Sequence, residues 1–471
     1  MATIASFGTY VPLFRLSRKE MGDAWGVPAV PGERAVANGD EDSITMAVAA
    51  AADCLAGIDP RSIDALFFAT TTAPYDEKQC AGVIAAALDM RKDINTADFT
   101  GSLRAATTAL RAAAAAVDSG SASSILVVAA DCRLGEPQSA WEQLLGDGAG
   151  AVVVSKHGPA VLRGFRSIAG EQMGVWRRSD DRYIRSFEIK AETRYGYVES
   201  TVRAGKAVLR ECDVAPGALA KAIISAGDPL SLGGVAKSLG LRSEQLEDIL
   251  FLSVGSPGTP LVLMMLASAL AQAKAGDRLL VVNSGDGADA FLVEIGEGFA
   301  PAGGRKGLAG CLAQRRSLPN YSAYAQRRKL MKRDEPDPRG SAVTYWRDTN
   351  IVLNFHGGRC AKCGVVQYPI PRLCNECATK DQIQEVTLAK TGRVFTFTLD
   401  HLDAGQYVNT PVPRLVIDLD GGGRVFLSMT DADPQEVKIG MAVEVIFRRL
   451  HEGAGFHNYY WKCRPAMEPV S

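Results

Sequence analysis

Four cysteines near the end of the chain place the tightest constraint on its fold. Cys360 and Cys363 form one C-x2-C pair, and Cys374 and Cys377 form a second pair further along. Each pair can present two thiolates from one tight turn, and two such turns complete a tetrahedral zinc site. Four protein ligands leave no position for water, so the spacing predicts a structural zinc rather than a catalytic one.

The residues around the cysteines are too few to form a core of their own. Metal binding, worth about 10–16 kcal/mol in small zinc domains, then supplies the folding energy of the predicted ribbon at 350–385. A redox role fits less well, because two pairs occur together and no βαβ pattern surrounds them. The other six cysteines of the chain are scattered, which favours a reducing, cytoplasmic compartment over a disulfide scaffold.

Length and charge limit the remaining choices. A chain of 471 residues is too long for one core, so we expect two to four domains. A net charge of −1 favours neither nucleic acid nor an anionic membrane as a partner. The longest apolar stretch, 260–273, is too short to span a bilayer and predicts a buried helix. The first residues lack the basic and apolar regions of a signal peptide, so we expect none.

Residues 1–300 alternate short apolar runs with Ala-rich segments, which is typical of an α/β domain with a buried sheet. The pattern predicts strands at 65–69 and 124–129 and a closely packing small-residue helix at 107–117. This part of the chain therefore carries the larger of the expected cores.

An internal similarity suggests that this α/β part is duplicated. Residues 62–68 resemble 246–252, and the Gly-rich segment 146–151 resembles 285–290, each preceded by an apolar run. The order of elements then occurs twice, and because the two offsets differ we expect an insertion at 155–200. The alternative is a chance likeness of two Gly-rich turns.

The sequence pattern changes after residue 300. Basic runs at 315–316, 327–329 and 332–333 predict a linker with one or two exposed helices, which face solvent or contact the phosphates of a ligand. Pro336 and Pro338 close this linker. We predict five segments: a first α/β half at 1–155, a second half at 156–300, a basic linker at 301–349, a zinc ribbon at 350–385 and a small barrel at 386–471.

The last segment consists of short alternating strands. We expect strands at 393–398, 414–419, 425–429 and 441–447, separated by Gly-rich turns such as 421–423. About five short strands in so few residues predict a small all-β barrel of the OB type.

Two resemblances to known families follow from particular motifs. From about residue 336 to 465, the chain resembles the acyl-CoA-associated family that joins a rubredoxin-like zinc ribbon to an OB fold. The motifs are the four cysteines, Tyr345-Trp346, Pro369-Ile370-Pro371-Arg372, Gly440-Met441 and Lys462-Cys463-Arg464-Pro465. The resemblance implies a module that accompanies thiolases and hydroxymethylglutaryl-CoA synthases, bridges subunits and helps to bind CoA.

Residues 1–300 resemble the hydroxymethylglutaryl-CoA synthase branch of the thiolase superfamily. The motifs are Glu41-Asp42-Ser43-x-Thr45-Met46-Ala47, Gly148-Ala149-Gly150-Ala151-Val152, Val175-Trp176-Arg177 and Tyr183-Ile184-Arg185-Ser186-Phe187. The resemblance implies a duplicated, five-layered thiolase-like α/β fold, a CoA thioester as substrate, carbon–carbon bond chemistry and a homodimer.

The catalytic residues of that family do not follow. Its nucleophilic cysteine falls on Leu103, its acid/base glutamate on Thr71 and its histidine on Gly227. Residues 1–300 contain a single histidine, His157, in a turn that predicts a surface position. Since acyl transfer by cysteine requires a base in the pocket, we expect the usual Cys/His/Glu mechanism to be absent.

Other side chains near the expected pocket are candidates for chemistry. Ser102, Asp228 and Tyr75 are the catalytic candidates, for example in a proton transfer of aldol type. Arg104 and Arg177 are the candidates for binding the CoA thioester.

Three functions remain open. The first is an enzyme that makes or breaks a carbon–carbon bond in an acyl-CoA without a cysteine nucleophile. The second is a non-catalytic CoA-binding scaffold for a separate thiolase. The third is a synthase whose nucleophile has moved, for example to Cys132.

Overall fold

The chain forms two compact units. The computed structural model describes residues 1–171, 174–299, 305–331, 341–402, 410–453 and 455–466. The first unit holds residues 1–37, 42–85 and 90–324. The second holds 325–471 together with two short segments, 38–41 and 86–89. In the described residues, every helix is too short or too polar to cross a bilayer.

A nine-stranded sheet organises the first unit, in the order β11-β12-β13-β8-β1-β7-β6-β4-β5. Its strands are β1 (Thr3–Tyr10), β4 (Ala65–Ala69), β5 (Asn95–Phe99), β6 (Ser124–Asp131), β7 (Gly148–Ser155), β8 (Ala160–Ala169), β11 (Lys221–Ile224), β12 (Arg278–Ser284) and β13 (Gly287–Ile295). The strands predicted at 65–69 and 124–129 are confirmed. β4, β6 and β7 are almost fully buried, as expected for strands read from continuous apolar runs.

The sheet contains the same arrangement twice. β4 and β6 are parallel and β7 is antiparallel to β6, just as β11 and β12 are parallel and β13 is antiparallel to β12. The edge strand β5 has no counterpart in the described part of the second copy. The copies join where β1 meets β8, through the pairs Thr3–Val161 and Ile4–Ala160. The predicted duplication is therefore confirmed.

One detail of that prediction is wrong. Residues 246–252 form no strand beyond an isolated bridge of Leu246, and β11 takes the place that corresponds to β4. Leu250 has φ = +59°, and its N–H donates to the Asp248 carboxylate, so the segment turns instead of extending. β8 corresponds to β1 and β11 corresponds to β4, and the sequence offset between the two copies is nearly the same for both pairs. Because the offset does not change between these strands, 155–200 contains no insertion and instead begins the second copy.

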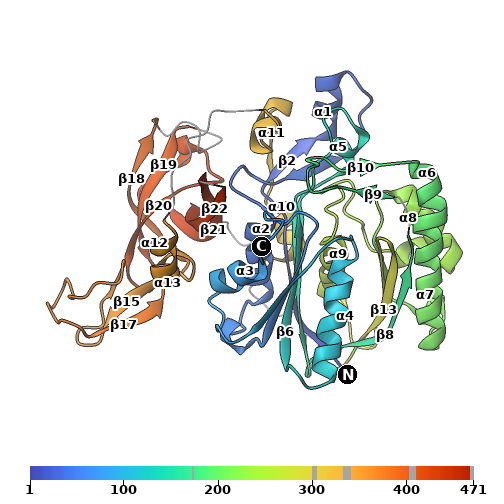
Figure 1. Ribbon diagram of the computed structural model, residues 1–471, viewed down its shortest axis with the longest axis horizontal. Coiled ribbons are helices and arrows are strands. Elements are labelled where there is room, and N and C mark those ends of the chain that lie inside the picture. Colours follow the sequence, from blue (N-terminus) through green and yellow to red (C-terminus); the bar gives the residue numbers. More distant parts are fainter. Residues whose placement is uncertain (172–173, 300–304, 332–340, 403–409, 454, 467–471) are drawn as a thin grey trace. The chain divides into compact units, whose positions relative to one another are not determined.

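The two halves of the sheet form two layers, and helices outside and between them complete five layers (Figure 1). The helices are α2 (Ser43–Cys54), α3 (Ala81–Ala87), α4 (Ala105–Asp118), α7 (Glu199–Glu211), α8 (Pro229–Leu239) and α9 (Leu261–Gln272). α2 covers one outer face on β1 and β7, and α7 covers the other on β8 and β13. α4 and α9 lie in the central layer, where Ala-rich α4 packs closely and α9 is apolar on all sides. The helix predicted at 107–117 and the buried helix at 260–273 are confirmed.

Short elements fill the remaining chain of this unit. They are β2 (Phe14–Ser17), α1 (Arg18–Trp25), β3 (Glu33–Val36), η1 (Pro60–Ser62), α5 (Ala140–Leu144), β9 (Val175–Trp176), β10 (Arg185–Ser186), α6 (Ile189–Ala191), η2 (Glu192–Val198), η3 (Pro216–Ala218), η4 (Ser243–Gln245), α10 (Gly307–Ala313), β14 (Arg316–Ser317) and α11 (Tyr321–Arg327). Most of them connect the strands of the large sheet.

Part of the segment predicted as an exposed linker is packed, whereas its later helix, α12 (Ala342–Arg347), has no buried residue and is exposed as predicted. α10 lies on β1 and α9 with Leu308 and Cys311 buried, and β14 pairs with β2. Arg327 and Arg328 are buried as well, so the interpretation of this run as a solvated face is wrong. A leucine and a cysteine on one face of α10 supply the apolar contacts that the linker prediction overlooked. The basic run at 332–333 and the prolines Pro336 and Pro338 lie outside the described residues.

A three-stranded ribbon opens the second unit. Its strands are ordered β16-β15-β17, and two short helices precede them. The elements are α12 (Ala342–Arg347), α13 (Thr349–Val352), β15 (His356–Cys360), β16 (Val366–Gln367) and β17 (Ile383–Thr387). The buried ring of His356 lies between two carboxylates, with Nε2 3.0 Å from Asp89 and Nδ1 2.5 Å from Glu385.

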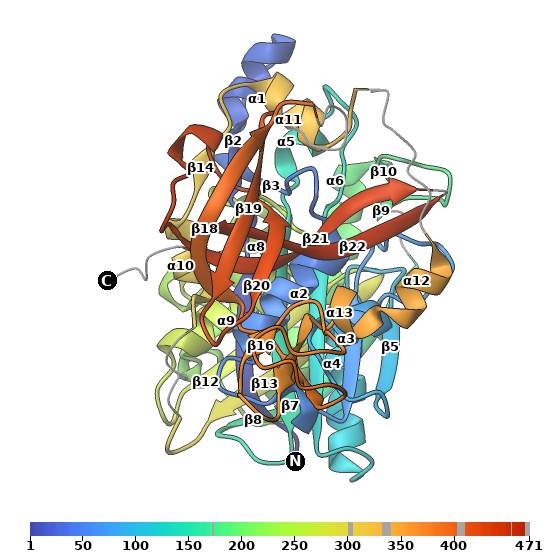
Figure 2. The same cartoon turned by 90° about the vertical axis from the view of Figure 1, so that its left-hand side faces the viewer.

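Five strands in the order β20-β19-β18-β21-β22 form the second sheet of this unit (Figure 2). The elements are β18 (Thr391–Asp400), β19 (Val412–Leu419), β20 (Arg424–Ser428), η5 (Pro434–Glu436), β21 (Ala442–Gly453) and β22 (Phe456–Pro465). A parallel bridge between Met429 and Cys463 closes the sheet, because it joins the chain after β20 to β22. Along β19, Leu415 and Ile417 point inward, which gives the alternation of a small barrel. The predicted OB-type barrel is confirmed.

Candidate active site and metal centre

The positions expected for catalysis follow the carboxyl ends of strands in the large sheet. Thr71 comes after β4, Leu103 after β5 and Gly227 after β11. β4, β5 and β6 are parallel, so the loops after them meet at one edge. This edge is where a ligand would meet the greatest number of loops.

A buried carboxylate fixes the loop that carries Thr71. Oδ1 of Asp131 accepts hydrogen bonds from the Thr70 and Thr72 hydroxyls (2.9 and 3.0 Å) and from the Thr71 N–H (2.7 Å). Oδ2 accepts from the Thr71 hydroxyl and the Thr259 N–H, both at 2.9 Å. Asp131 is fully buried, so these five donors replace its water. Thr71 is therefore held as part of a rigid network rather than presented as a proton carrier.

Two arginines lie beside this network. Arg133 is buried, and burial lowers the pKa of its guanidinium although the Asp131 charge opposes the shift. Arg177, just after β9, donates from Nη2 to the Thr71 carbonyl at 2.9 Å and is otherwise exposed. The structure thus brings predicted residue Arg177 to the Thr71 loop, and its contact with CoA stays a prediction.

Asn283 connects the turn before α4 with the loop of Gly227. Its Nδ2 donates to the Leu103 carbonyl at 3.2 Å, and its Oδ1 accepts from the Ser225 hydroxyl at 2.7 Å. A Cβ on Gly285 would lie 3.0 Å from the Leu103 Cβ, so the turn between β12 and β13 touches the turn before α4. Asn283 therefore links Leu103, the position expected for the nucleophile, to Ser225, two residues before Gly227, the position expected for the histidine. That these two positions correspond to the family's cysteine and histidine stays a prediction.

The predicted site residues beside Leu103 are already engaged. Arg104 forms an ion pair with the buried Asp289 at 3.1 Å, and Thr107 donates to the same carboxylate at 2.7 Å. The Ser102 hydroxyl accepts from the Arg104 N–H at 3.3 Å. The contacts of Ser102 and Arg104 with a thioester stay predictions.

Asp228 and Tyr75 lie on two different loops. Asp228 is the N-cap of α8, where its carboxylate accepts from the Leu230 and Ser231 N–H groups, both at 2.9 Å, and from the Ser231 hydroxyl. Tyr75 is half-buried in the loop after β4, with the Lys78 ammonium 5.8 Å from its ring centroid. Their roles in proton transfer stay predictions.

His157 lies far from this edge. It follows β7, whose last residue, Ser155, pairs with Ser124 at the start of β6, whereas Asp131 is at the other end of β6. The whole length of β6, about 23 Å at 3.3 Å per residue, therefore separates His157 from the site. His157 is exposed, as expected for a surface turn.

The two residues that organise this edge, Asp131 and Asn283, were not predicted. Asp131 lies at the end of β6 and Asn283 near the end of β12, and both strands are otherwise continuous apolar runs. A polar residue at the end of such a run is the sequence signal that could have identified them. Their partners lie more than 50 residues away in the sequence, so no local spacing indicates the networks.

The four clustered cysteines meet as predicted. Their Sγ atoms all lie within 4.8 Å of one another, with Cys360 and Cys377 3.6 Å apart and Cys363 and Cys374 3.5 Å apart. In each turn, the residue after the second cysteine donates its N–H to the carbonyl of the first cysteine at 2.9 Å. A four-thiolate set of this kind could hold a metal ion with tetrahedral geometry.

Those two turns impose an unusual backbone. Gly364 and Ala378, the residues that follow the second cysteine of each pair, have φ = +77° and +56°. A hydroxyl and an N–H of Thr379 lower the pKa of the Cys377 thiol to about 6, which favours the thiolate form required of a ligand. Gln367 adds a hydrogen bond to the Cys374 Sγ at 3.6 Å. The residues present therefore fit a metal ion.

Comparisons with known proteins define the class. Residues 97–168 match the model of 3-oxoacyl-[acyl-carrier-protein (ACP)] synthase III, and 385–448 match that of the ChsH2 C-terminal OB-fold domain. Together with the duplicated sheet and its five layers of sheet and helix, these matches define a thiolase-like α/β protein with an appended OB-fold domain.

Relatives then show the family. The hydroxymethylglutaryl-CoA synthase of Pyrococcus furiosus is 31% identical over 335 residues, 69% of this chain and 95% of the relative. That of Thermococcus sibiricus is 32% identical over 334 residues, again 69% and 95%. The chain belongs to the hydroxymethylglutaryl-CoA synthase family.

Solved structures show the same fold. MvaS in complex with 3-hydroxy-3-methylglutaryl coenzyme A matches with a TM-score of 0.62 at 20% identity, covering 72% of this chain and 94% of that one. 3-Oxoacyl-[acyl-carrier-protein] synthase III from Aquifex aeolicus VF5 matches with a TM-score of 0.56 at 24% identity, covering 62% and 100%.

Proposed function

We propose that this chain binds CoA thioesters and takes part in forming or cleaving a carbon–carbon bond without an acyl-cysteine intermediate. Membership of the hydroxymethylglutaryl-CoA synthase family supports the CoA-thioester chemistry. The observation that carries the second part is Leu103, which precedes α4 where the family resemblance places the nucleophile. A helix start favours a thiolate, whereas an aliphatic side chain offers no electron pair to a thioester.

The surroundings support the same conclusion. Burial raises the pKa of the Cys54 and Cys80 thiols to about 12, so neither is a thiolate near neutral pH. The histidine of the first unit, His157, is at the opposite edge of the sheet, and Thr71 is held by Asp131. A thiol without a base within hydrogen-bond reach is a weak nucleophile.

An aldol-type cleavage assigns roles to the predicted residues. Asp228 accepts the proton of a β-hydroxyl group, the carbon–carbon bond breaks, and the electron pair passes to the thioester as an enolate. Tyr75 then returns a proton to carbon, while Ser102 donates a hydrogen bond to the thioester oxygen. Arg104 and Arg177 are proposed to bind the anionic groups of CoA. Asp228→Asn tests this scheme, because asparagine also caps helices well and a loss of activity then reports chemistry rather than folding.

Mass spectrometry tests the absence of an acyl-enzyme. The purified chain is incubated with acetyl-CoA or acetoacetyl-CoA and analysed as the intact protein. We expect no stable acyl adduct on any cysteine of residues 1–300. An adduct that maps to Cys132 or Cys80 would refute the proposal and support a synthase with a relocated nucleophile.

A second candidate is a non-catalytic scaffold that binds CoA next to a separate thiolase. The match of residues 385–448 to the ChsH2-type OB-fold domain favours it. Turnover of an acyl-CoA panel by this chain alone supports the enzyme, whereas turnover only after a thiolase is added supports the scaffold. Size-exclusion chromatography of the chain, alone and together with the thiolase, also tests the expected homodimer.

We also propose that the four-cysteine group holds a structural zinc ion. Four cysteine Sγ atoms within 4.8 Å of one another provide the four-thiolate donor set that zinc prefers in sites without an open position. Metal analysis should find about one zinc per chain. Iron in its place, or no metal, would count against zinc.

A further inference from the structure

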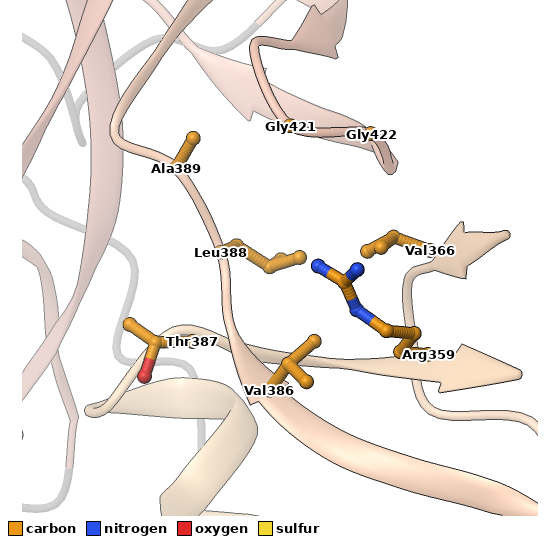
Figure 3. A pocket seen from close by; sticks show the side chains of 8 residues that line it. All are labelled: Arg359, Val366, Val386, Thr387, Leu388, Ala389, Gly421 and Gly422. Atoms are coloured by element: carbon orange, nitrogen blue, oxygen red, sulfur yellow. The ribbon is translucent and has the colours of Figure 1, made fainter. Parts of the chain in front are cut away.

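A cavity of about 290 Å³ lies within the second unit (Figure 3). The ribbon contributes Arg359 and Val366, residues 386–389 lead from β17 toward β18, and the turn between β19 and β20 contributes Gly421 and Gly422. Most of these side chains are aliphatic. The cavity is at the lower end of the size range of ligand sites, so it suits a small molecule.

Glycines keep this space open. Gly421 and Gly422 have φ = +136° and +92°, conformations that other residues adopt only with strain. A Cβ on Gly422 would lie 3.2 Å from the Val366 Cβ, and one on Gly421 would lie 3.7 Å from the Ala389 Cβ. Any side chain on this turn would therefore occupy the volume that the glycines leave free.

Arg359 is the charged residue of the cavity. Figure 3 shows its guanidinium between the side chains of Leu388 and Val366. Within the described residues, neither an ion pair nor a hydrogen bond engages this group, and no acidic residue lines the cavity. Arg372 on the same ribbon differs, since it is paired with Asp381 at 2.6 Å. Arg359 is exposed, so water solvates its permanent charge, and an anion that enters the cavity would not have to displace an acidic partner.

We propose that this cavity binds a small monocarboxylate with an apolar body. The planar guanidinium can hold a carboxylate through two parallel hydrogen bonds, while Val366, Val386 and Leu388 contact the hydrocarbon part. At about 30 Å³ for each water-sized group, the volume accommodates about ten non-hydrogen atoms. Octanoate, with eight carbons and two oxygens, is the matching probe.

Calorimetry with the full, zinc-loaded chain tests the proposal. Octanoate is titrated into the wild type and into three variants, and 1-octanol and inorganic phosphate serve as reference ligands. Arg359→Gln removes the charge, Ala389→Phe fills the cavity while keeping the charge, and Arg372→Gln is the control for a lost surface charge. Zinc content and the circular dichroism spectrum of each variant establish that it is folded.

We expect octanoate to bind one site per chain. Its affinity should fall about tenfold or more in Arg359→Gln and in Ala389→Phe and should be unchanged in Arg372→Gln. The proposal is overturned if octanoate does not bind, if 1-octanol binds equally well, or if phosphate binds equally well. It is also overturned if both cavity variants retain wild-type affinity.

Discussion

Replacing Asp131 is the strongest test of how the first unit is held together. Its carboxylate accepts five hydrogen bonds, two of them from the backbone N–H groups of Thr71 and Thr259. In Asp131→Asn, the hydroxyls of the three threonines can rotate to suit the new amide. A backbone N–H cannot reverse, so either orientation of the amide places an NH2 group against Thr71 or Thr259.

The expected loss follows from these contacts. One buried donor left without a partner costs about 1–3 kcal/mol, and the lost charge weakens the remaining bonds by about 1 kcal/mol in total. The charge also offsets that of Arg133. We therefore expect Asp131→Asn to lower the free energy of unfolding of the first unit by about 3 kcal/mol, and Asp131→Ala, which loses all five bonds, by about 5 kcal/mol.

Hydrogen exchange measured by mass spectrometry suits a protein of two units, because it reports each unit separately. Amides of β4 and β6 that exchange only on unfolding should exchange on the order of 100-fold faster in Asp131→Asn. Asp93, whose side chain is 79% exposed, provides the control Asp93→Asn, for which we expect a change of no more than about 0.5 kcal/mol. If Asp131→Asn behaves like that control, the hydrogen-bond network does not hold this edge of the sheet.

Three further predictions concern the metal, a histidine and the position of Leu103. Cys374→Ser should reduce bound zinc and unfold the ribbon while leaving exchange in the first unit unchanged; full zinc content by metal analysis would contradict this. Burial alone lowers the pKa of His356, but hydrogen bonds with Asp89 and Glu385 raise it above its usual value. Protonated His356 should therefore stabilise the second unit below a pH of about 6.5, and this stabilisation should be lost as the pH rises through the folded-state pKa. Thermal unfolding midpoints should show this pH dependence in the wild type but not in His356→Gln. The same pH dependence in both proteins would refute the prediction. Leu103→Cys alone should form no acyl-enzyme, whereas the triple variant that adds Thr71→Glu and Gly227→His should form one. A histidine side chain has room at this position, because no atom lies within 4 Å of a Cβ at Gly227. Acylation of the single variant, detected by intact-protein mass spectrometry, would contradict this.

Local patterns were sufficient for most of the fold. Continuous apolar runs identified β4 and β6, and the cysteine spacing identified the thiolate cluster, because both signals lie within a few residues. Residues 246–252 have the composition of a strand, but their conformation depends on a single Asp248 side chain and a left-handed Leu250. α10 looked like a linker because its burial requires β1, about 300 residues earlier.

The site was predictable only in part. The family resemblance assigned the expected catalytic positions to Leu103, Thr71 and Gly227 without any knowledge of contacts, and this assignment stays a prediction. The networks around Asp131 and Asn283 join residues from both copies of the duplicated fold, so they depend on topology rather than on spacing. For the same reason, the ion pair of Arg104 with Asp289 could not be anticipated from either segment alone.

The shared central layer has a consequence for synthesis on the ribosome. α9 belongs to the second copy, yet it packs on β1 and β7 of the first copy as well as on β11 and β12. The first copy is complete at Ser155, but the apolar face that α9 covers stays uncovered until Gln272 has been made. At about 5–20 residues per second, this interval lasts roughly 6 to 23 seconds. During this time the nascent chain exposes part of its future core, which makes it a substrate for chaperones that bind apolar segments.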